Sequence, residues 1–309
     1  PEFRDLSPGQ ASTLLKTNQP TFRPTSSQQN FPLCMGNCFS PSLPQATVDA
    51  RRGFYAINDN YRSIAEVQAA LRAVGLESSD LILGIDYTKS NTWTGEKTFG
   101  GRCLHETQRL EYQGELNPYQ RVISIVGRTL EAFDDDKLIP AYGFGDLFTK
   151  DKTCFPFYPD GRPCERFEGV LQRYNQITPG VTLAGPTNFA PVIRKAIEIV
   201  KAEHSYHILV IIADGQVTNR RDTEAAIVEA SHYPISIVVV GVGDGPWELM
   251  EEFDDELPER VFDNFQFVDF NKVVNSVPEG KDADAAFACA ALMEIPEQYQ
   301  LIKQLGYLR

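Results

Sequence analysis

Three runs of the chain are apolar at nearly every position: LILGI (81–85), ILVIIA (208–213) and ISIVVV (235–240). A strand with one face in water alternates apolar and polar residues, whereas a strand buried on both faces is apolar throughout. Strands of the second kind are typical of parallel sheets that helices cover on both sides. The three runs therefore predict an α/β domain.

The wider pattern alternates between strand-like and helical segments. The predicted strands are Leu81–Ile85, Leu138–Phe144, His207–Ala213, Ile235–Val242 and Phe265–Phe270. Helical spacing of apolar residues occurs at Ile64–Leu76, Pro118–Phe133, Cys164–Ile177, Phe189–Glu203, Asp222–His232, Pro246–Phe253 and Ala283–Leu292. This alternation predicts a doubly wound, mostly parallel sheet flanked by helices, with the core sheet at about 78–272 and C-terminal helices at 281–305.

The first 55 residues differ in composition from the rest. They are rich in Pro, Ser, Thr, Gln and Asn and poor in aliphatic residues. Such a segment buries too little apolar surface to offset the entropy lost on folding. We therefore expect a disordered tail over residues 1–55 and a folded domain over residues 60–305.

Charge and cysteine content narrow the class of protein. The chain of 309 residues has 29 Lys and Arg against 42 Asp and Glu, a formal charge of −13. Nucleic-acid binding needs a basic face, so this balance argues against it. No apolar run reaches the roughly 18 residues of a transmembrane helix. Six cysteines without a CxxC pair favour reduced thiols, and hence a cytoplasmic location, with the plasma membrane or the nucleus as alternatives.

Polar side chains follow the predicted strands where those strands end. The first buried strand runs into DYTKS (86–90), which offers a carboxylate and two hydroxyls at alternate positions. Asp214 follows the strand that ends at residue 213, and Thr187 lies in a Gly-Pro-Thr-Asn loop before a helix. Binding sites of doubly wound sheets lie at the carboxyl ends of the strands. We therefore expect five side chains to converge: Asp86, Thr88, Ser90, Thr187 and Asp214.

All five side chains are oxygen donors, which suits a hard cation. Mg²⁺ prefers about six oxygen ligands and commonly keeps some water. Only two of the donors are charged, so the ion would keep positive charge and attract a carboxylate from a partner. Mg²⁺ is the expected ion, with Mn²⁺ and Ca²⁺ as alternatives. Taken singly, each residue also has an ordinary role in capping a helix or starting a turn.

The same residues resemble a known site. D-x-T-x-S, the Thr of the GPTN loop and the Asp after a buried strand resemble the metal-ion-dependent adhesion site of von Willebrand factor A domains. The segments GIDYTKSN (84–91), IIADGQVT (211–218) and GVGDGPW (241–247) resemble the copine-type domain of plant RING domain ubiquitin ligases, and the last two favour that group over animal copines. The resemblance covers roughly residues 61–305.

This resemblance implies a role for each residue. The hydroxyls of Thr88 and Ser90 would bind the metal directly, and Asp86 and Asp214 would act directly or through water. Thr187 would join when a partner carboxylate docks. Thr88 stands where most A domains have Ser, and its added methyl group would affect only the packing of the loop.

Two functions remain open on this basis. The first is a protein-binding module that captures an exposed Asp or Glu of a partner protein at the metal. The second is the substrate-recruiting part of a RING-type E3 ubiquitin ligase. The plant ligases carry a RING finger after this domain, and no cysteine follows Cys289 here. We identify no catalytic residue, so an enzymatic role depends on a RING finger.

A further motif lies near the amino terminus. MGNCFS (35–40) fits the pattern M-G-x-x-x-S, which directs myristoylation of the glycine after removal of Met. Gly36 is then the candidate for myristoylation and Cys38 for palmitoylation, provided that Met35 is the native start. Two acyl chains would support peripheral association with a membrane. The alternative is a chance match within a tail.

The four histidines supply no paired Cys/His spacing for a structural zinc site. His204 and His207 flank the start of a predicted strand. We interpret them as a helix end and a packed residue rather than as metal ligands.

Overall fold

The computed structural model describes residues 47–49, 54–56 and 63–308, except 74, 77, 108–114, 131–132, 135, 256 and 258–259. Most of the predicted tail, with Gly36 and Cys38, lies outside the described residues. Two short strands, β1 (Thr47–Asp49) and β2 (Phe54–Ala56), pair antiparallel. The sequence does not predict this pair.

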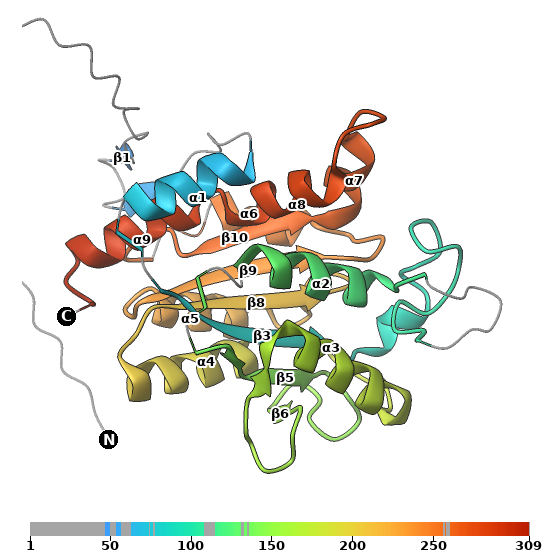
Figure 1. Cartoon of the computed structure of the whole chain (residues 1–309). Helices are drawn as coiled ribbons and strands as arrows, with labels where there is room; N and C mark the ends of the chain where they lie inside the picture. Colours follow the sequence, from blue (N-terminus) through green and yellow to red (C-terminus); the bar gives the residue numbers. More distant parts are fainter. Residues whose placement is uncertain are drawn as a thin grey trace, which may run out of the picture. The chain divides into compact units, whose positions relative to one another are not determined.

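A six-stranded sheet forms the centre of the domain (Figure 1). Its strands are β3 (Asp80–Asp86), β5 (Ala141–Phe144), β6 (Cys154–Pro156), β8 (His207–Ala213), β9 (Ile235–Gly241) and β10 (Phe265–Asp269). Their order is β10-β9-β8-β3-β5-β6, and only β6 runs antiparallel to its neighbour. The predicted doubly wound, mostly parallel sheet is confirmed.

Helices cover both faces of this sheet (Figure 1). One face carries α2 (Pro118–Leu130), α3 (Arg166–Ile177), α7 (Phe270–Ser276), α8 (Ala283–Leu292) and α9 (Ile295–Gln304). The other face carries α4 (Ala190–Glu203), α5 (Arg220–Ala230) and α6 (Glu248–Asp255). Helix α1 (Ile64–Ala73) contacts α8 and α9.

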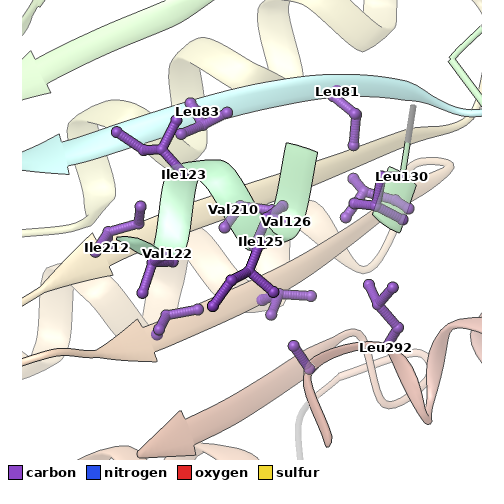
Figure 2. Packing of buried hydrophobic residues seen from close by; sticks show 14 of the residues in the cluster. Leu81, Leu83, Val122, Ile123, Ile125, Val126, Leu130, Val210, Ile212 and Leu292 are labelled. Atoms are coloured by element: carbon purple, nitrogen blue, oxygen red, sulfur yellow. The ribbon is translucent and has the colours of Figure 1, made fainter. Parts of the chain in front are cut away.

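Successive residues of the central strands enter opposite cores. In β3, Leu81 and Leu83 pack on the side of α2, whereas Ile82 packs on the side of α4. In β8, Val210 packs on the side of α2 and Leu209 on the side of α4. Figure 2 shows α2 lying against the first of these faces, with its apolar side chains directed at the strands. Burial of both faces explains why the sequence of these strands is apolar throughout.

The predicted strand over 138–144 is divided in two. Pro140 has no N–H to donate to a neighbouring strand, and it separates β4 (Leu138–Ile139) from β5. β4 pairs with β7 (Cys164–Glu165) in a small second sheet, so α3 begins at Arg166 rather than at Cys164. The short strand β6 and helix α7 are also absent from the sequence prediction.

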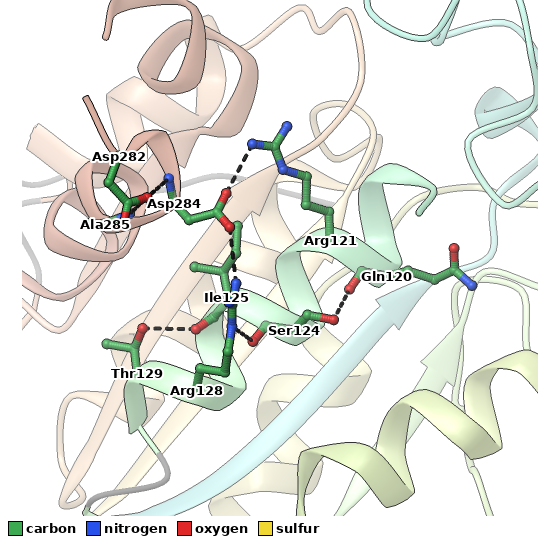
Figure 3. Close-up of polar contacts among 9 residues, drawn as sticks. All are labelled: Gln120, Arg121, Ser124, Ile125, Arg128, Thr129, Asp282, Asp284 and Ala285. Carbon is green, nitrogen blue, oxygen red and sulfur yellow. Dashed lines mark hydrogen bonds and ion pairs between the residues drawn. The ribbon is translucent and has the colours of Figure 1, made fainter. Parts of the chain in front are cut away.

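Charged side chains connect the carboxyl-terminal helices to α2 (Figure 3). The carboxylate of Asp284 in α8 lies 3.0 Å from a guanidinium nitrogen of Arg121 and 3.0 Å from one of Arg128. Asp282 caps α8 by accepting hydrogen bonds from the N–H groups of Asp284 and Ala285. Both ion pairs are partly exposed, so each contributes at most about 1 kcal/mol, and they mainly fix the position of α8.

Candidate metal centre

The two aspartates predicted to bind metal lie at the ends of adjacent strands. Asp86 is the last residue of β3, and Asp214 directly follows β8. β3 and β8 are parallel, and their register pairs Ile85 with Ile212. Both aspartates are fully buried. The fold therefore places two carboxylates from distant parts of the sequence at one edge of the sheet.

Two hydroxyls join these carboxylates. The Thr88 and Ser90 hydroxyl oxygens lie 2.8 Å apart. The Ser90 hydroxyl donates to Oδ1 of Asp214 at 3.1 Å, and that of Thr88 lies 3.4 Å from the same oxygen. Thr88 N–H donates to Oδ1 of Asp86 at 2.7 Å. Four of the five predicted ligands thus form one cluster.

One carboxylate oxygen of this cluster has no hydrogen-bond partner in the described part of the chain. Oδ2 of Asp86 is buried and has no hydrogen-bond partner among the described residues. A buried, unpaired carboxylate oxygen costs free energy that a bound cation would offset. The residues present therefore fit a hard divalent ion, since all the available donors are oxygens.

Electrostatics within the cluster agree with this fit. Burial raises the pKa of Asp86 well above its usual range, and the nearby charge of Asp214 raises it further. Burial also raises the pKa of Asp214, although hydrogen bonds from Thr94 and Ser90 oppose that rise. Two buried carboxylates at one place disfavour ionisation unless positive charge is near. A divalent cation would supply that charge.

The fifth predicted residue, Thr187, lies in a neighbouring loop. Ala184 of that loop accepts a hydrogen bond from Lys89 N–H at 2.7 Å, and Thr187 accepts one from Thr218 N–H at 2.9 Å, both through backbone carbonyls. Backbone hydrogen bonds therefore connect this loop to the segments that follow β3 and β8. The Thr187 hydroxyl has no hydrogen bond to the other four residues, and in the described part of the chain it has no partner.

The loop after β3 is held by groups that the sequence analysis did not select. It forms a short 3-10 helix, Lys89–Thr92. The Asn91 side chain donates to the backbone oxygen of Thr88 at 3.0 Å. Tyr119 of α2 donates its hydroxyl to Oδ1 of Asn91 at 2.7 Å and lies 3.2 Å from the Asp86 carbonyl. These buried contacts fix the orientation of the strand end that carries Asp86.

His105, which lies in a different segment, also contacts the end of β3 at Asp86. Its ring stacks between Tyr87, at 4.7 Å between centroids, and Tyr119, at 4.0 Å. Burial lowers the pKa of His105 to about 3, so the ring is neutral. Nε2 lies 2.7 Å from the Asp86 carbonyl oxygen and Nδ1 lies 2.7 Å from the Tyr174 hydroxyl. The neutral ring therefore donates from Nε2 and accepts at Nδ1.

Thr94 is a further residue of the site that the sequence analysis missed. Its hydroxyl lies 2.6 Å from Oδ2 of Asp214, the oxygen not used by Ser90. The available indication was a further hydroxyl residue four positions after Ser90, close to the D-x-T-x-S motif. Thr94 orients Asp214 rather than adding a charged ligand.

Large apolar side chains are exposed around this edge of the sheet. Trp93 is 56% exposed, Leu147 is 47% exposed and Phe148 is 87% exposed. Leu147 and Phe148 follow β5, which is the parallel neighbour of β3. The backbone there passes so close to the site that a Cβ on Gly145, whose φ is +80°, would overlap the Thr88 methyl group.

The parallel sheet with helices on both faces, and polar loops at its carboxyl edge, defines a von Willebrand factor A-like α/β domain. Residues 103–309 match the family model for copines, and the chain belongs to the copine family.

Curated relatives include animal copines and plant ligases. The chain is 54% identical to copine family protein 2 of Caenorhabditis elegans over 81% of its length, which is 3% of that protein. It is 51% identical to the Arabidopsis thaliana E3 ubiquitin-protein ligases RGLG1 and RGLG3, over 83% and 81% of this chain. It spans 54% of the first ligase and 70% of the second. The chain thus corresponds to only a part of these relatives.

Solved structures with a similar fold include the manganese-loaded TRAP protein of Plasmodium vivax. The TM-score is 0.43 at 13% sequence identity, and the match covers 64% of this chain and 71% of that one. Separately, none of the described helices combines the length and the apolar character needed to cross a bilayer.

Proposed function

We propose that this copine domain binds a divalent metal ion, expected to be Mg²⁺, and uses it to capture an Asp or Glu side chain of a partner protein. The observation that carries the proposal is the cluster of Asp86, Thr88, Ser90 and Asp214, in which one buried carboxylate oxygen has no hydrogen-bond partner within the described chain. Such a cluster is costly unless a cation completes it.

Four of the residues would bind the ion, and the fifth would respond to the partner. The hydroxyls of Thr88 and Ser90 would bind it directly, and Asp86 and Asp214 directly or through water. Only two of these donors are charged and the others are neutral hydroxyls, so the ion would stay electrophilic and an open position would favour an incoming carboxylate. Thr187, whose hydroxyl has no partner among the residues that the structure describes, would turn to the metal when the partner docks.

The surroundings of the cluster suit a protein partner. Trp93, Leu147 and Phe148 expose apolar surface beside the proposed ion. Exposed aromatic residues next to a specific polar contact are typical of protein interfaces. The metal would then recognise one acidic residue, and the apolar rim would contact its neighbours in the partner.

Calorimetric titration tests the metal site directly. Wild-type protein should bind one equivalent of Mg²⁺ or Mn²⁺ at this cluster, and Asp214→Asn should lose that binding. Asp160→Asn, an exposed aspartate in a turn between β6 and β7, is the matched control and should bind like wild type. Equal affinity in Asp214→Asn and wild type would contradict the proposal.

Selection from a random peptide library tests the capture of a carboxylate. Peptides enriched on the immobilised domain in Mg²⁺ should contain an Asp or Glu, and changing that residue to Asn or Gln should abolish binding. EDTA and Asp214→Asn should have the same effect. Enriched peptides that bind equally well in EDTA would exclude the metal as the receptor.

A second candidate function is recruitment of substrates for a RING-type E3 ubiquitin ligase. The observation that favours it is the 51% identity to two plant E3 ubiquitin-protein ligases. The reading frame beyond Arg309 decides whether a Cys- and His-rich finger follows. If it does, Asp214→Asn in the longer protein should preserve self-ubiquitination and lose the modification of substrates, whereas loss of both activities would contradict this division of roles.

Acylation remains a separate proposal. A protein that begins at Met35 should incorporate myristate at Gly36, with Cys38 available for palmitate, and should associate with membranes. Gly36→Ala should abolish the labelling. Equal labelling of the two proteins would refute the proposal.

A further inference from the structure

A second cluster of ligand-type side chains lies at the opposite edge of the sheet. Asp80 is the first residue of β3 and His207 the first residue of β8, and the two are register partners. Glu203 is the last residue of α4, just before β8. A strand of this length rises about 3.3 Å per residue, so this cluster lies about 20 Å from Asp86 and Asp214.

The three side chains converge on one point. Nε2 of His207 lies 2.9 Å from Oε2 of Glu203 and 3.9 Å from Oδ2 of Asp80. One ligand atom from each residue lies within 4.8 Å of the other two. A single ion can therefore contact all three with only small movements of the side chains.

The oxygen atoms around the imidazole ring supply a second observation. Nε2 faces the Glu203 carboxylate, while Nδ1 lies 3.2 Å from the backbone oxygen of Ser205. Both ring nitrogens thus face oxygen acceptors. A neutral imidazole has only one N–H, so one nitrogen would direct its lone pair at an acceptor. A metal ion bound at Nε2 would remove this mismatch, because Nδ1 can then donate to Ser205. The Glu203 side chain, which is largely exposed, would move back from its 2.9 Å contact with Nε2 to admit the ion.

The local charge favours the metal. His207 is only 1% exposed. Asp80 also lies within 4.8 Å of the carboxylates of Asp134 and Asp136, so several acidic side chains gather around one imidazole ring. Among the residues that the structure describes, no lysine or arginine pairs with Asp80 or Glu203. A divalent ion balances the two carboxylates that face it.

The contacts around His207 and Asp80 also resemble those around metal ligands. A metal-binding histidine usually donates its other N–H to a carbonyl or carboxylate, and here Nδ1 lies 3.2 Å from the backbone oxygen of Ser205, which can accept such a bond. The Ser205 hydroxyl donates to Oδ2 of Asp80 at 2.5 Å and orients that carboxylate. One nitrogen and two carboxylate oxygens suit Zn²⁺ better than Mg²⁺, which prefers oxygen alone.

We propose that Asp80, Glu203 and His207 form a Zn²⁺ site at the amino-terminal edge of the sheet, with water as the expected fourth ligand. The ion would connect the end of α4 to the first residues of β3 and β8. This site is separate from the cluster of Asp86, Thr88, Ser90 and Asp214, and the proposal does not depend on the function suggested for that cluster. The sequence alone does not indicate this site, because His207 has no Cys or His partner at the spacing typical of structural zinc sites.

Competition with a zinc-chelating dye in excess Mg²⁺ tests the proposal on the full chain. Wild type should bind one equivalent of Zn²⁺ that His207→Asn and Glu203→Gln weaken at least tenfold. His204→Asn, at the exposed end of α4, is the matched control and should bind like wild type. Asp214→Asn should keep Zn²⁺ and lose Mg²⁺, so failure at one site is distinguishable from failure at the other.

Nitrogen NMR of His207 gives an independent readout in case the His207 variant does not fold. With Zn²⁺ present, Nε2 should show the shift of a metal-bound nitrogen and Nδ1 that of an N–H. Two protonated ring nitrogens in the presence of Zn²⁺ would overturn the proposal. So would equal Zn²⁺ affinity in wild type and Glu203→Gln, a substitution at a largely exposed side chain that leaves the core intact.

Discussion

The Ser90 hydroxyl donates to Oδ1 of Asp214 at 3.1 Å across 124 residues of sequence. This contact exists because β3 and β8 are parallel neighbours whose following segments leave the sheet at the same edge. It leaves Asp214 well supplied with donors, since Thr94 approaches its other oxygen. Asp86 is the less satisfied partner, with Oδ2 unpaired among the described residues. A bound cation would therefore stabilise Asp86 more than Asp214.

Asp86→Asn should stabilise the protein in EDTA and abolish its response to Mg²⁺. The buried carboxylate of Asp86 faces the charge of Asp214, and the neutral amide removes that repulsion while keeping the shape. We expect a gain of about 1 kcal/mol in EDTA. In Mg²⁺ the order should reverse, because only the wild type gains binding energy. Thermal unfolding in both buffers measures the effect, and an equal Mg²⁺ shift in the two proteins would contradict it.

Thr94→Val should weaken Mg²⁺ binding about tenfold without removing a ligand. The substitution keeps the size of the side chain but deletes the hydroxyl that lies 2.6 Å from Oδ2 of Asp214. Thr92→Val is the matched control, since the exposed Thr92 hydroxyl donates only to the backbone oxygen of Lys89. Calorimetric titration compares the two variants. The same affinity in both would show that Thr94 does not orient Asp214.

The sheet and the cluster of Asp86 and Asp214 could be predicted because each follows from a local pattern. Strands β8 and β9 are apolar throughout since both of their faces are buried, and an aspartate directly after β8 must lie at the carboxyl edge. Pro140 indicates that the strand over 138–144 divides, because proline has no N–H to donate to a neighbouring strand. The apolar residues on both sides of Pro140 predict one continuous strand instead.

The supporting residues could not be predicted, because they depend on tertiary contacts. His105 reaches the Asp86 carbonyl from an irregular segment with no periodicity, and its stacking partners come from β3 and α2. The position of His207 at the start of a strand predicts a packed residue rather than a ligand, and its burial agrees with packing. Its approach to Glu203 and Asp80 becomes visible only when strand register and the end of α4 are known.

Gly127→Ala should destabilise the domain by about 2–3 kcal/mol, because α2 and α3 approach closely at this residue. A Cβ on Gly127 would overlap the ring of Phe167. Gly169 in α3 is the matched control, since a Cβ there would lie 3.9 Å from its nearest neighbours. Gly169→Ala should therefore stabilise by about 0.5–1 kcal/mol, the ordinary gain of Ala over Gly in a helix. Urea unfolding measures both, and a stabilised Gly127→Ala would contradict the close packing of these helices.

Glu297→Gln should remove part of the dependence of stability on pH. Glu297 in α9 is buried, its Oε1 has no hydrogen-bond partner in the described chain, and burial raises its pKa to about 7. The folded state then holds a proton that the unfolded state releases near pH 4.5, so wild-type stability falls as the pH rises from about 4.5 to 7. The variant should match wild type below that range and exceed it at pH 8 by up to about 3 kcal/mol. Urea unfolding at pH 5 and pH 8 measures the difference, and the exposed Glu279→Gln should show none. A constant gap between Glu297→Gln and wild type at both pH values would mean that the carboxyl does not titrate within the fold.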